Sequence, residues 1–348
     1  MIHNSVLKIL VAATAAVPAW GLASPVGVFT IVDGDVVVIR ESSKFTAVEG
    51  LHVLADDIVR TTDATRLARI ELVDGGALDV GPATQLMLRP RSPTLQSVRP
   101  ATVYLSQGWL KLTSARNAAS GELDFASPRV DLNKLAGNVV ARVARDAAFV
   151  FVESGAAELV ERRDGKAARG VALRDGEAYT DRGDVAGAVT SRPPAHMVQT
   201  IPRAFTDSLP LRAALFQSRT VAAPASAEVG YDDVSGWING EPMVRLVSRQ
   251  RWSAKAREAR FRARLIAELR SHPEWDRVLF PEKYAPKRAS VARSGSAAAA
   301  PAATVSAAAA ATHAVPKAPD PPLGGVPVAA GLAAPDWAPT RPLVGRFN

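Results

Sequence analysis

The chain has 348 residues, no cysteine and a formal net charge of +8. A chain of this length can bury one or two hydrophobic cores without the help of a disulfide or a structural metal. The absence of cysteine excludes disulfides, cysteine-ligated zinc and the acylated cysteine of a bacterial lipoprotein. Residues 24–193 contain 21 Lys and Arg against 22 Asp and Glu, whereas residues 194–288 contain 16 against 10. The basic character of the chain therefore belongs to its second half.

The start of the chain has the features of a secretory signal peptide over residues 1–23. Lys8 precedes an apolar run at 9–20, and the small residues Gly21 and Ala23 follow. This pattern predicts export and cleavage after Ala23. The alternative is an uncleaved membrane anchor, although the run is shorter than the ~20 residues that usually span a bilayer. We expect a soluble periplasmic protein that is not a lipoprotein and has no transmembrane span after cleavage.

Residues 24–193 are predicted to form a β domain, because apolar and polar residues alternate in short runs separated by Gly, Asp and Asn. The clearest run is IELVDGGALDVGPATQLML at 70–88, where Asp74-Gly75-Gly76 supplies a turn. Arg69 and Glu71 are predicted to point outward. The residues predicted to share the inward face are Ala68, Ile70, Leu72, Leu78, Val80, Leu86 and Leu88. Similar units recur along the domain, so the fold class is mainly β, as a sandwich, a barrel or a β-roll.

The order of several residues in this domain resembles the FecR-like domain of bacterial envelope proteins. Gly34 lies in VDGDVVV, and the resemblance continues through 48–88 into SGAAELV and LRDGEAY. The family pairs a Gly with a later Asp and Thr, before an Asp-Gly turn and a Pro. The matching residues here are Gly50, Asp57, Thr61, Asp74, Gly75 and Pro82. The resemblance covers roughly residues 26–182 and implies a FecR-like β-sandwich or β-roll; Ser127-Pro128 and Gly137-Asn138 depart from the family's Thr-Pro and Gly-Thr.

This resemblance implies an envelope protein. FecR-like regulators of transcription sit in the inner membrane, with a cytoplasmic segment that contacts a sigma factor and a periplasmic domain that receives a signal from an outer-membrane receptor. Here the 23 residues before the β domain are assigned to the export signal. We therefore expect a stand-alone exported member without the cytoplasmic arm that regulates the sigma factor.

Residues 194–285 are predicted to form a small helical appendage. Residues 220–230, TVAAPASAEVG, have the composition of a linker. A helix is predicted from about Pro242 to Arg270. The residues of its predicted apolar stripe are Trp252, Ala256, Ala259, Ala263 and Ile266, with Leu265 and Leu269 beside them. The aromatic stretch HPEWDRVLFPEKY is predicted to pack as an end-cap, and the Ala- and Pro-rich residues 286–348 are predicted to form a disordered tail.

Three arginines of the predicted helix form a candidate binding site. Arg257, Arg260 and Arg264 fall on one stripe, opposite the apolar stripe. Such a stripe can attract phosphate groups of an anionic surface. The alternative is an ordinary solvated helix face with pairing between residues four positions apart. Because export separates the protein from nucleic acid, we expect no nucleic-acid partner.

No catalytic or metal-binding pattern stands out in the sequence. The five histidines have no partner at metal-ligand spacing, and the nucleophile-elbow, dinucleotide and phosphate-loop patterns are absent. Asp56 and Asp57 are adjacent, and neighbours on a strand face opposite sides of a sheet. We therefore expect no enzyme, and no catalytic, metal or cofactor residues.

These observations favour a non-enzymatic, periplasmic protein-interaction module that binds another envelope protein or a cell-wall component. A glycan- or peptidoglycan-associated binding module is the second hypothesis. An envelope signalling regulator of the FecR type is a further alternative, and a hydrolase with catalytic residues on distant loops is the last.

Overall fold

The computed structural model describes residues 24–90, 101–115, 123–183, 185–217, 219, 221 and 225–284. The predicted signal peptide, residues 1–23, and the predicted disordered tail, residues 286–348, lie outside the described residues. Within the described part of the chain, no helix has the length and apolar character needed to cross a membrane.

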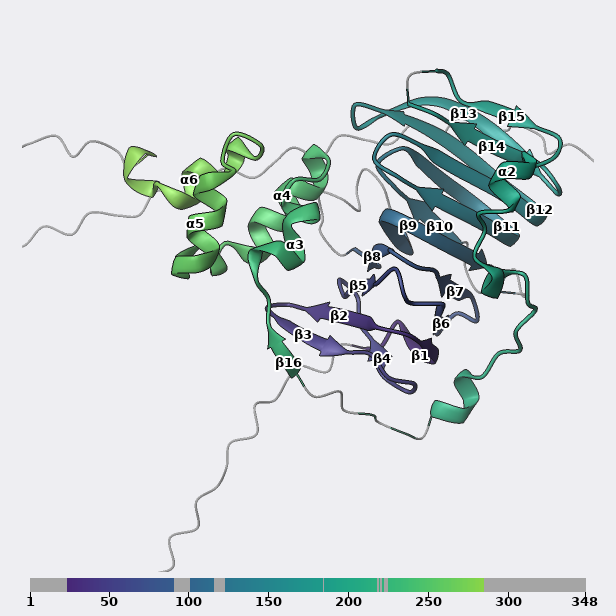
Figure 1. Cartoon of the computed structure of the whole chain (residues 1–348), viewed down its shortest axis with the longest axis horizontal. Coiled ribbons are helices and arrows are strands. Elements are labelled where there is room, and N and C mark those ends of the chain that lie inside the picture. Colours follow the sequence, from purple (N-terminus) through teal and green to yellow (C-terminus); the bar gives the residue numbers. More distant parts are fainter. Residues whose placement is uncertain are drawn as a thin grey trace, which may run out of the picture. The chain divides into compact units, whose positions relative to one another are not determined.

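The fold is mainly β, with 42% of the described residues in strands against 22% in helices, which confirms the predicted fold class. Figure 1 labels the elements. The strands are β1 (Gly27–Asp33), β2 (Val36–Arg40), β3 (Ser43–Thr46), β4 (His52–Val53), β5 (Ile58–Thr61), β6 (Leu67–Leu72), β7 (Ala77–Val80), β8 (Gln85–Leu88), β9 (Val103–Thr113), β10 (Leu123–Ala126), β11 (Val130–Val143), β12 (Ala148–Arg163), β13 (Lys166–Arg174), β14 (Ala178–Asp181), β15 (Ala188–Thr190) and β16 (Ala225–Glu228).

These strands form one continuous mixed sheet rather than two separate ones. Its main path runs β15-β14-β12-β11-β10-β9-β8-β5-β2-β3-β16, and β1, β4, β6, β7 and β13 branch from this path. The branch at β9 arises because its first half pairs with β8 and its second half with β7. A second layer therefore forms from β1, β6 and β7, and the two layers enclose the main core.

The two longest strands, β11 and β12, run past one another and bend at a shared point. Gly137 is paired with Gly155 there, and both have positive φ angles, of 97° and 91°. A Cβ atom on either glycine would collide with the backbone of the other strand, at Ser154 or Ala136. Only glycine accepts this combination of φ and close approach, so the pair allows both strands to bend without ending. On one side of the bend, β11 pairs with β10 and β12 pairs with β13. On the other side, β11 pairs with β9 and β12 pairs with β14.

The main core confirms the alternation predicted for residues 68–88. All seven residues predicted to face inward are buried in the same hydrophobic cluster, which also contains side chains from β1, β9, β11 and β12. Burial of such apolar side chains is the main favourable term in folding. The opposite face differs from the expectation, since Arg69 and Glu71 are also buried, at 4% and 2% exposure.

The segment between β15 and β16 covers that second face. We call residues 194–216 the strap; it contains α2 (Ala195–Val198) and the 3₁₀ helices η2 (Arg203–Phe205) and η3 (Ala213–Phe216). In Figure 1 the segment after β15 passes β6 and β7 before it returns to β16. Strap side chains pack on a second apolar cluster that includes Leu67, Trp109 and Phe149.

The predicted linker at 220–230 contains a strand. Residues Ala225–Glu228 pair as β16 with the edge strand β3, and the backbone N–H of Val229 donates to the Ser42 carbonyl at 2.9 Å. The linker prediction is corrected here, because the Ala- and Ser-rich composition hides main-chain pairing, which needs no particular side chain.

The remaining described residues form the helical part. Its elements are α3 (Tyr231–Ile238), α4 (Pro242–Trp252), η4 (Lys255–Arg257), α5 (Ala259–Ala267), η5 (Pro273–Trp275), α6 (Asp276–Leu279) and η6 (Pro281–Tyr284). The aromatic stretch predicted as an end-cap packs inward in part, since Trp275 and Leu279 are buried whereas Tyr284 is 50% exposed. The core of the helical part includes Tyr104, Ile39 and Met87 of the β strands, so contacts cross the predicted domain boundary between residues 193 and 194.

The single helix predicted from Pro242 to Arg270 is wrong. The chain leaves α4 after Trp252, makes the 3₁₀ turn η4, and passes through Glu258, whose backbone is extended (φ −76°, ψ 129°), before α5 begins. The break resets the helical phase. Phe261 and Leu265 therefore face the core of the helical part, whereas Ile266 of the predicted apolar stripe is 42% exposed.

Candidate interaction site

Four charged side chains lie in a row across the outer face of β6, β7 and β9. The charged row consists of Arg69, Glu71, Asp79 and Lys111. Arg69 is the cross-strand partner of Asp79, and Asp79 is the partner of Lys111. Side chains alternate between the two faces of a strand. Since the neighbours of the charged row point into the main core, its members must point to the opposite face, where the strap lies.

The charged row binds the backbone of the strap rather than its side chains. Lys111 Nζ donates to the Phe205 carbonyl at 2.5 Å, and Arg69 Nη2 donates to the Leu209 carbonyl at 3.4 Å. The carboxylate of Glu71 accepts from the N–H groups of Arg212, at 2.8 and 2.9 Å, and of Ala213, at 2.7 Å. The strap thus finds donors and acceptors for its main chain along this face, as buried backbone groups require.

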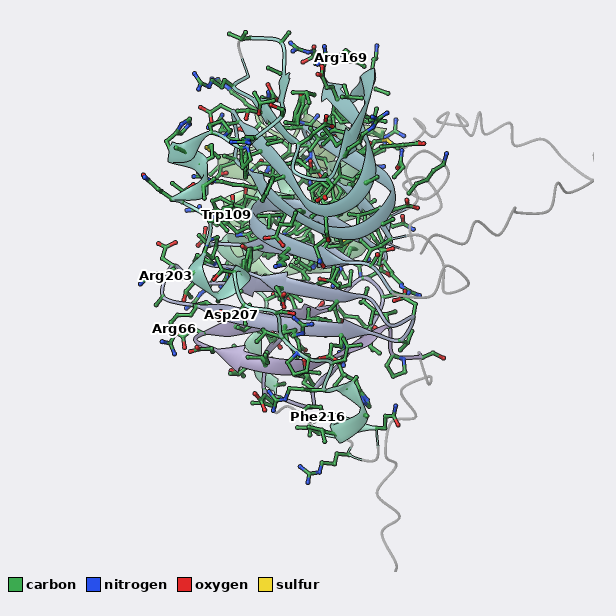
Figure 2. All side chains as sticks on the ribbon, turned by 90° about the vertical axis from the view of Figure 1, so that its right-hand side faces the viewer. Arg66, Trp109, Arg169, Arg203, Asp207 and Phe216 are labelled. Carbon is green, nitrogen blue, oxygen red and sulfur yellow. The ribbon has the colours of Figure 1, made fainter. Side chains whose placement is uncertain are left out.

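One aromatic side chain anchors the strap to the same face. Phe205 is fully buried and packs in the cluster that contains Trp109 and Phe149. Gly81 makes room for it, because a Cβ atom at that position would lie 2.8 Å from Trp109 Cβ and 3.1 Å from Phe205 Cζ. Arg203 and Asp207, labelled in Figure 2 with Trp109, flank the anchor and are exposed.

Ion pairs made by the charged row, one of them with Glu153 of β12, offset part of the cost of its burial. Arg69 Nη1 contacts the two carboxylate oxygens of Asp79 at 2.9 and 3.0 Å, and Lys111 Nζ lies 2.7 Å from the carboxylate of Glu153. Burial nevertheless raises the pKa of the Asp79 carboxyl above its ordinary value, and the opposing effects of Arg69 and Lys111 do not cancel this rise. The cover that the strap provides therefore has an electrostatic cost.

The sequence did not identify this site, although one signal for it was present. Asp74-Gly75 sets the turn of the β6–β7 hairpin, and the turn fixes the register that places Arg69 opposite Asp79. The sequence alone was therefore enough to predict that Arg69 and Asp79 place opposite charges at paired positions of the hairpin. Their burial could not be predicted in this way, because it depends on Phe205 and its neighbours, more than 120 residues later in the chain.

The three arginines of the predicted anionic-surface site lie on two elements. Arg257 is in η4, whereas Arg260 and Arg264 are one turn apart on α5. All three are exposed. Arg264 is already engaged, since its Nη2 lies 2.9 Å from Asp232 and 3.1 Å from Glu268. The structure therefore joins Arg260 and Arg264 on one helix and separates Arg257 from them.

Several other basic side chains of the helical part donate to backbone carbonyls. Arg251 reaches the carbonyls of Asp56 at 2.6 Å and Ile39 at 3.3 Å, and so ties α4 to the sheet. Arg262 reaches the carbonyl of Leu279 at 2.6 Å. Short helices leave many carbonyls without intrahelical partners. Part of the basic character of this half of the chain therefore has a structural use.

The polar residues of the FecR resemblance hold the scaffold. Arg40 binds the carboxylate of Asp57 through Nε at 2.9 Å and Nη2 at 2.7 Å, and the hydroxyl of Thr61 donates to the carbonyl of Gly81 at 2.7 Å. Gly50 has a φ of 86°, and its N–H donates to the carbonyl of Phe29 at 2.7 Å. Each of these residues secures a turn or a strand end.

The described histidines do not gather with other potential ligands. Within the described residues, no group of three or more His, Asp or Glu side chains is placed to hold a metal ion. His272 is fully buried beside Tyr231 and Trp275, and burial lowers its pKa. This histidine belongs to the core of the helical part.

The geometry defines a mainly β protein whose sheet carries a charged face bound to an irregular segment with short helical turns. No protein-family model matches the chain, and no curated protein matches it. Among solved structures, the chain is similar to two crystal structures described as a "putative anti-sigma factor" from Parabacteroides distasonis ATCC 8503. Both have a TM-score of 0.32, with sequence identities of 14% and 11%, and each similarity covers 39% of this chain. The chain spans 59% of the length of these structures.

Proposed function

We propose that the protein is a FecR-like interaction module of the bacterial envelope, which binds a polypeptide segment of another envelope protein. The observation that carries this proposal is the charged row. Its side chains already hold the strap by the backbone, at the carbonyls of Phe205 and Leu209 and the N–H groups of Arg212 and Ala213. Recognition of main-chain groups with one side-chain anchor is a general mode of peptide binding.

The residues of the FecR resemblance support the same proposal. Gly50, Asp57 and Thr61 occupy structural positions in the turns of the β domain. Their polar groups are used within the scaffold, which leaves recognition to the outer face and the strap. The periplasmic location rests on the predicted signal peptide, and the proposal includes this location.

Site-specific photocrosslinking in envelope preparations tests this function. A photoreactive amino acid at Arg203 or Asp207, which are exposed on either side of the Phe205 anchor, should give adducts with another envelope protein. The same amino acid at Glu282, which is exposed on η6, is the matched control and should give no such adduct. Sedimentation with purified sacculi, without protein adducts at Arg203 or Asp207, would instead favour the peptidoglycan-associated module and contradict the proposal.

A further inference from the structure

We propose that the face of the charged row is an acceptor site that the strap fills in cis, and that its partner in trans is a polypeptide segment with an aromatic anchor. This inference rests on the proposed function and names the chemistry of the partner. Three observations support it: the bonds that hold the strap, the surface that release of the strap exposes, and the exposure of β15 and β16 on either side of the strap.

The contacts fix where the strap lies on this face, but they require few particular residues in the strap. Its polar bonds to the charged row involve main-chain atoms, which any residue other than proline at the two N–H positions can supply. Among the side chains of the strap, Phe205 is fully buried and Phe216 is 8% exposed. A different segment with an aromatic residue at the position of Phe205 would therefore meet the same face with the same bonds.

This spacing describes the partner. Counted from the aromatic residue, the segment offers its own carbonyl and the carbonyl four residues later, followed by N–H groups seven and eight residues later. Pro202 and Pro210 show where the segment can carry proline without losing a bond to the charged row. Such a segment is uncharged at its anchor and irregular from there to the first N–H position, with a short helical turn that ends at the anchor and another that begins at the second N–H position.

Release of the strap exposes charged groups as well as apolar surface. Arg69, Glu71, Asp79 and Lys111 lose the strap as a cover, and water then hydrates them again. Hydration of ions is strongly favourable, so it offsets part of the loss of contacts. A segment held over buried charges is thus easier to exchange than one held over an apolar face of equal size.

The strap can also leave without breaking the main core. It connects β15 to β16, and every residue of these two strands is exposed. Each lies at one end of the main path of the sheet. Residues 195–200 of the strap, except the half-buried Met197, are exposed as well. Local opening draws on regions of this kind, with few buried contacts.

A labelled peptide with the sequence of residues 200–216 tests the acceptor site in the full exported chain. The wild-type protein should bind it weakly, because a tethered competitor acts at an effective concentration of about a millimolar. Phe205→Ala in the protein removes the anchor of the strap and should tighten peptide binding at least tenfold, measured by fluorescence anisotropy. Adding Glu71→Gln, which keeps the shape but removes the charge that strengthens the bonds to N–H groups, should weaken it again about tenfold.

A peptide with alanine in place of the phenylalanine is the control and should bind at least tenfold more weakly. Equal binding of both peptides, or equal affinity of the folded Phe205→Ala variant and the wild type, would overturn the acceptor site. If the Phe205→Ala variant does not fold, hydrogen exchange of the wild-type protein tests the acceptor site instead. Rapid local exchange at Arg212 and Ala213, with slow exchange at Ile70, supports release of the strap, whereas equally slow exchange at all three overturns it.

The two tests separate the two proposals. Adducts at Arg203 or Asp207 without peptide binding would keep the interaction function and reject this acceptor site. Peptide binding without any envelope adduct would keep the acceptor site and reject the envelope partner. A dimer that forms by exchange of straps between two copies would reveal itself by size-exclusion chromatography and would overturn the assignment of the partner to another protein.

Discussion

Arg69 lies directly opposite Asp79 in the β6–β7 hairpin, and its Nη1 atom contacts both oxygens of that carboxylate while each residue is no more than 4% exposed. A pair at this depth behaves differently from a surface pair. The two charges compensate one another, so the loss of Arg69 leaves Asp79 buried with Lys111 as its remaining positive neighbour.

Arg69→Met is expected to lower the free energy of unfolding by about 3–5 kcal/mol, the cost of breaking a buried ion pair. Urea unfolding of the full chain measures it. Arg66→Met is the matched control, because Arg66 pairs with Asp33 at 2.7 Å but is 78% exposed, and exposed pairs contribute about 0–1 kcal/mol. Equal losses in the two variants would contradict the burial of Arg69.

His272 makes the helical part sensitive to mild acid. Burial is the largest cause that lowers the pKa of His272 below 6.5, against the smaller effects of Glu274 and Glu268. Its Nδ1 atom has no hydrogen-bond partner among the described residues. The unfolded chain therefore takes up this proton first as pH falls below 6.5, and stability is lost from that pH downward at up to about 1.4 kcal/mol per pH unit.

Urea unfolding at pH 7.5 and 5.5, followed by tryptophan fluorescence, measures this dependence, because Trp237, Trp252 and Trp275 lie in the same core. His272→Gln should reduce the difference between the two pH values. His196→Gln, a change of an exposed histidine on α2, should leave the difference as in the wild type. If both variants keep the wild-type difference, the acid sensitivity arises elsewhere.

The arginines of the predicted anionic-surface site are expected to behave as a solvated face. Changing Arg257 and Arg260 to Gln should alter stability by no more than about 0.5 kcal/mol each, as is usual at exposed positions. Arg264→Gln also breaks the pairs with Asp232 and Glu268 and should cost up to about 1 kcal/mol.

We expect sedimentation with anionic vesicles at physiological salt to be the same for the wild type and the triple variant. If instead the site binds such a surface, each lost charge is worth about 1 kcal/mol, and the triple variant should bind roughly a hundredfold more weakly. A drop of that size would establish the arginines as a docking site.

The β domain predicted at 24–193 can be compared with a fragment of residues 24–285. Both should give a β-type circular dichroism spectrum. The shorter fragment leaves Tyr104 and Trp109 without the helical part and the strap that cover them, and large apolar side chains contribute about 1.5–3 kcal/mol each when buried. We expect it to be less stable by at least about 3 kcal/mol in urea unfolding. Equal stability would show that the boundary at residue 193 is also an energetic one.

The sequence was sufficient for the parts of the fold that depend on neighbouring residues. The alternation at 68–88 and the Asp74-Gly75 turn together fix which side chains face the core and which strand positions pair. The alternation of apolar and polar residues and the choice of turn residues are local properties, so a short stretch of sequence is enough to predict them. The same stretch also contains the opposite charges of Arg69 and Asp79, and with them half of the candidate site.

The remaining features depend on distant contacts. Residues 253–257 include good helix formers, yet the helix breaks there, where Trp252 Nε1 donates to the carbonyl of Glu41 at 3.3 Å and Lys255 pairs with Glu228 at 3.3 Å. Tertiary contacts routinely override helix propensity in this way. The strap and β16 were hidden for the same reason. The strap lies in the predicted helical appendage and β16 in the predicted linker, and only their long-range partners reveal what they bind.

The Gly137–Gly155 pair constrains how this sequence can change length. The two glycines are separated by 18 positions in the chain but face each other across β11 and β12. Removal of one residue between the bend and the turn that joins these strands would move one glycine out of register and bring a side chain against the opposite backbone. Insertions and deletions in this hairpin are therefore tolerated only when they are balanced in both strands, or when they fall in the turn itself at 144–147.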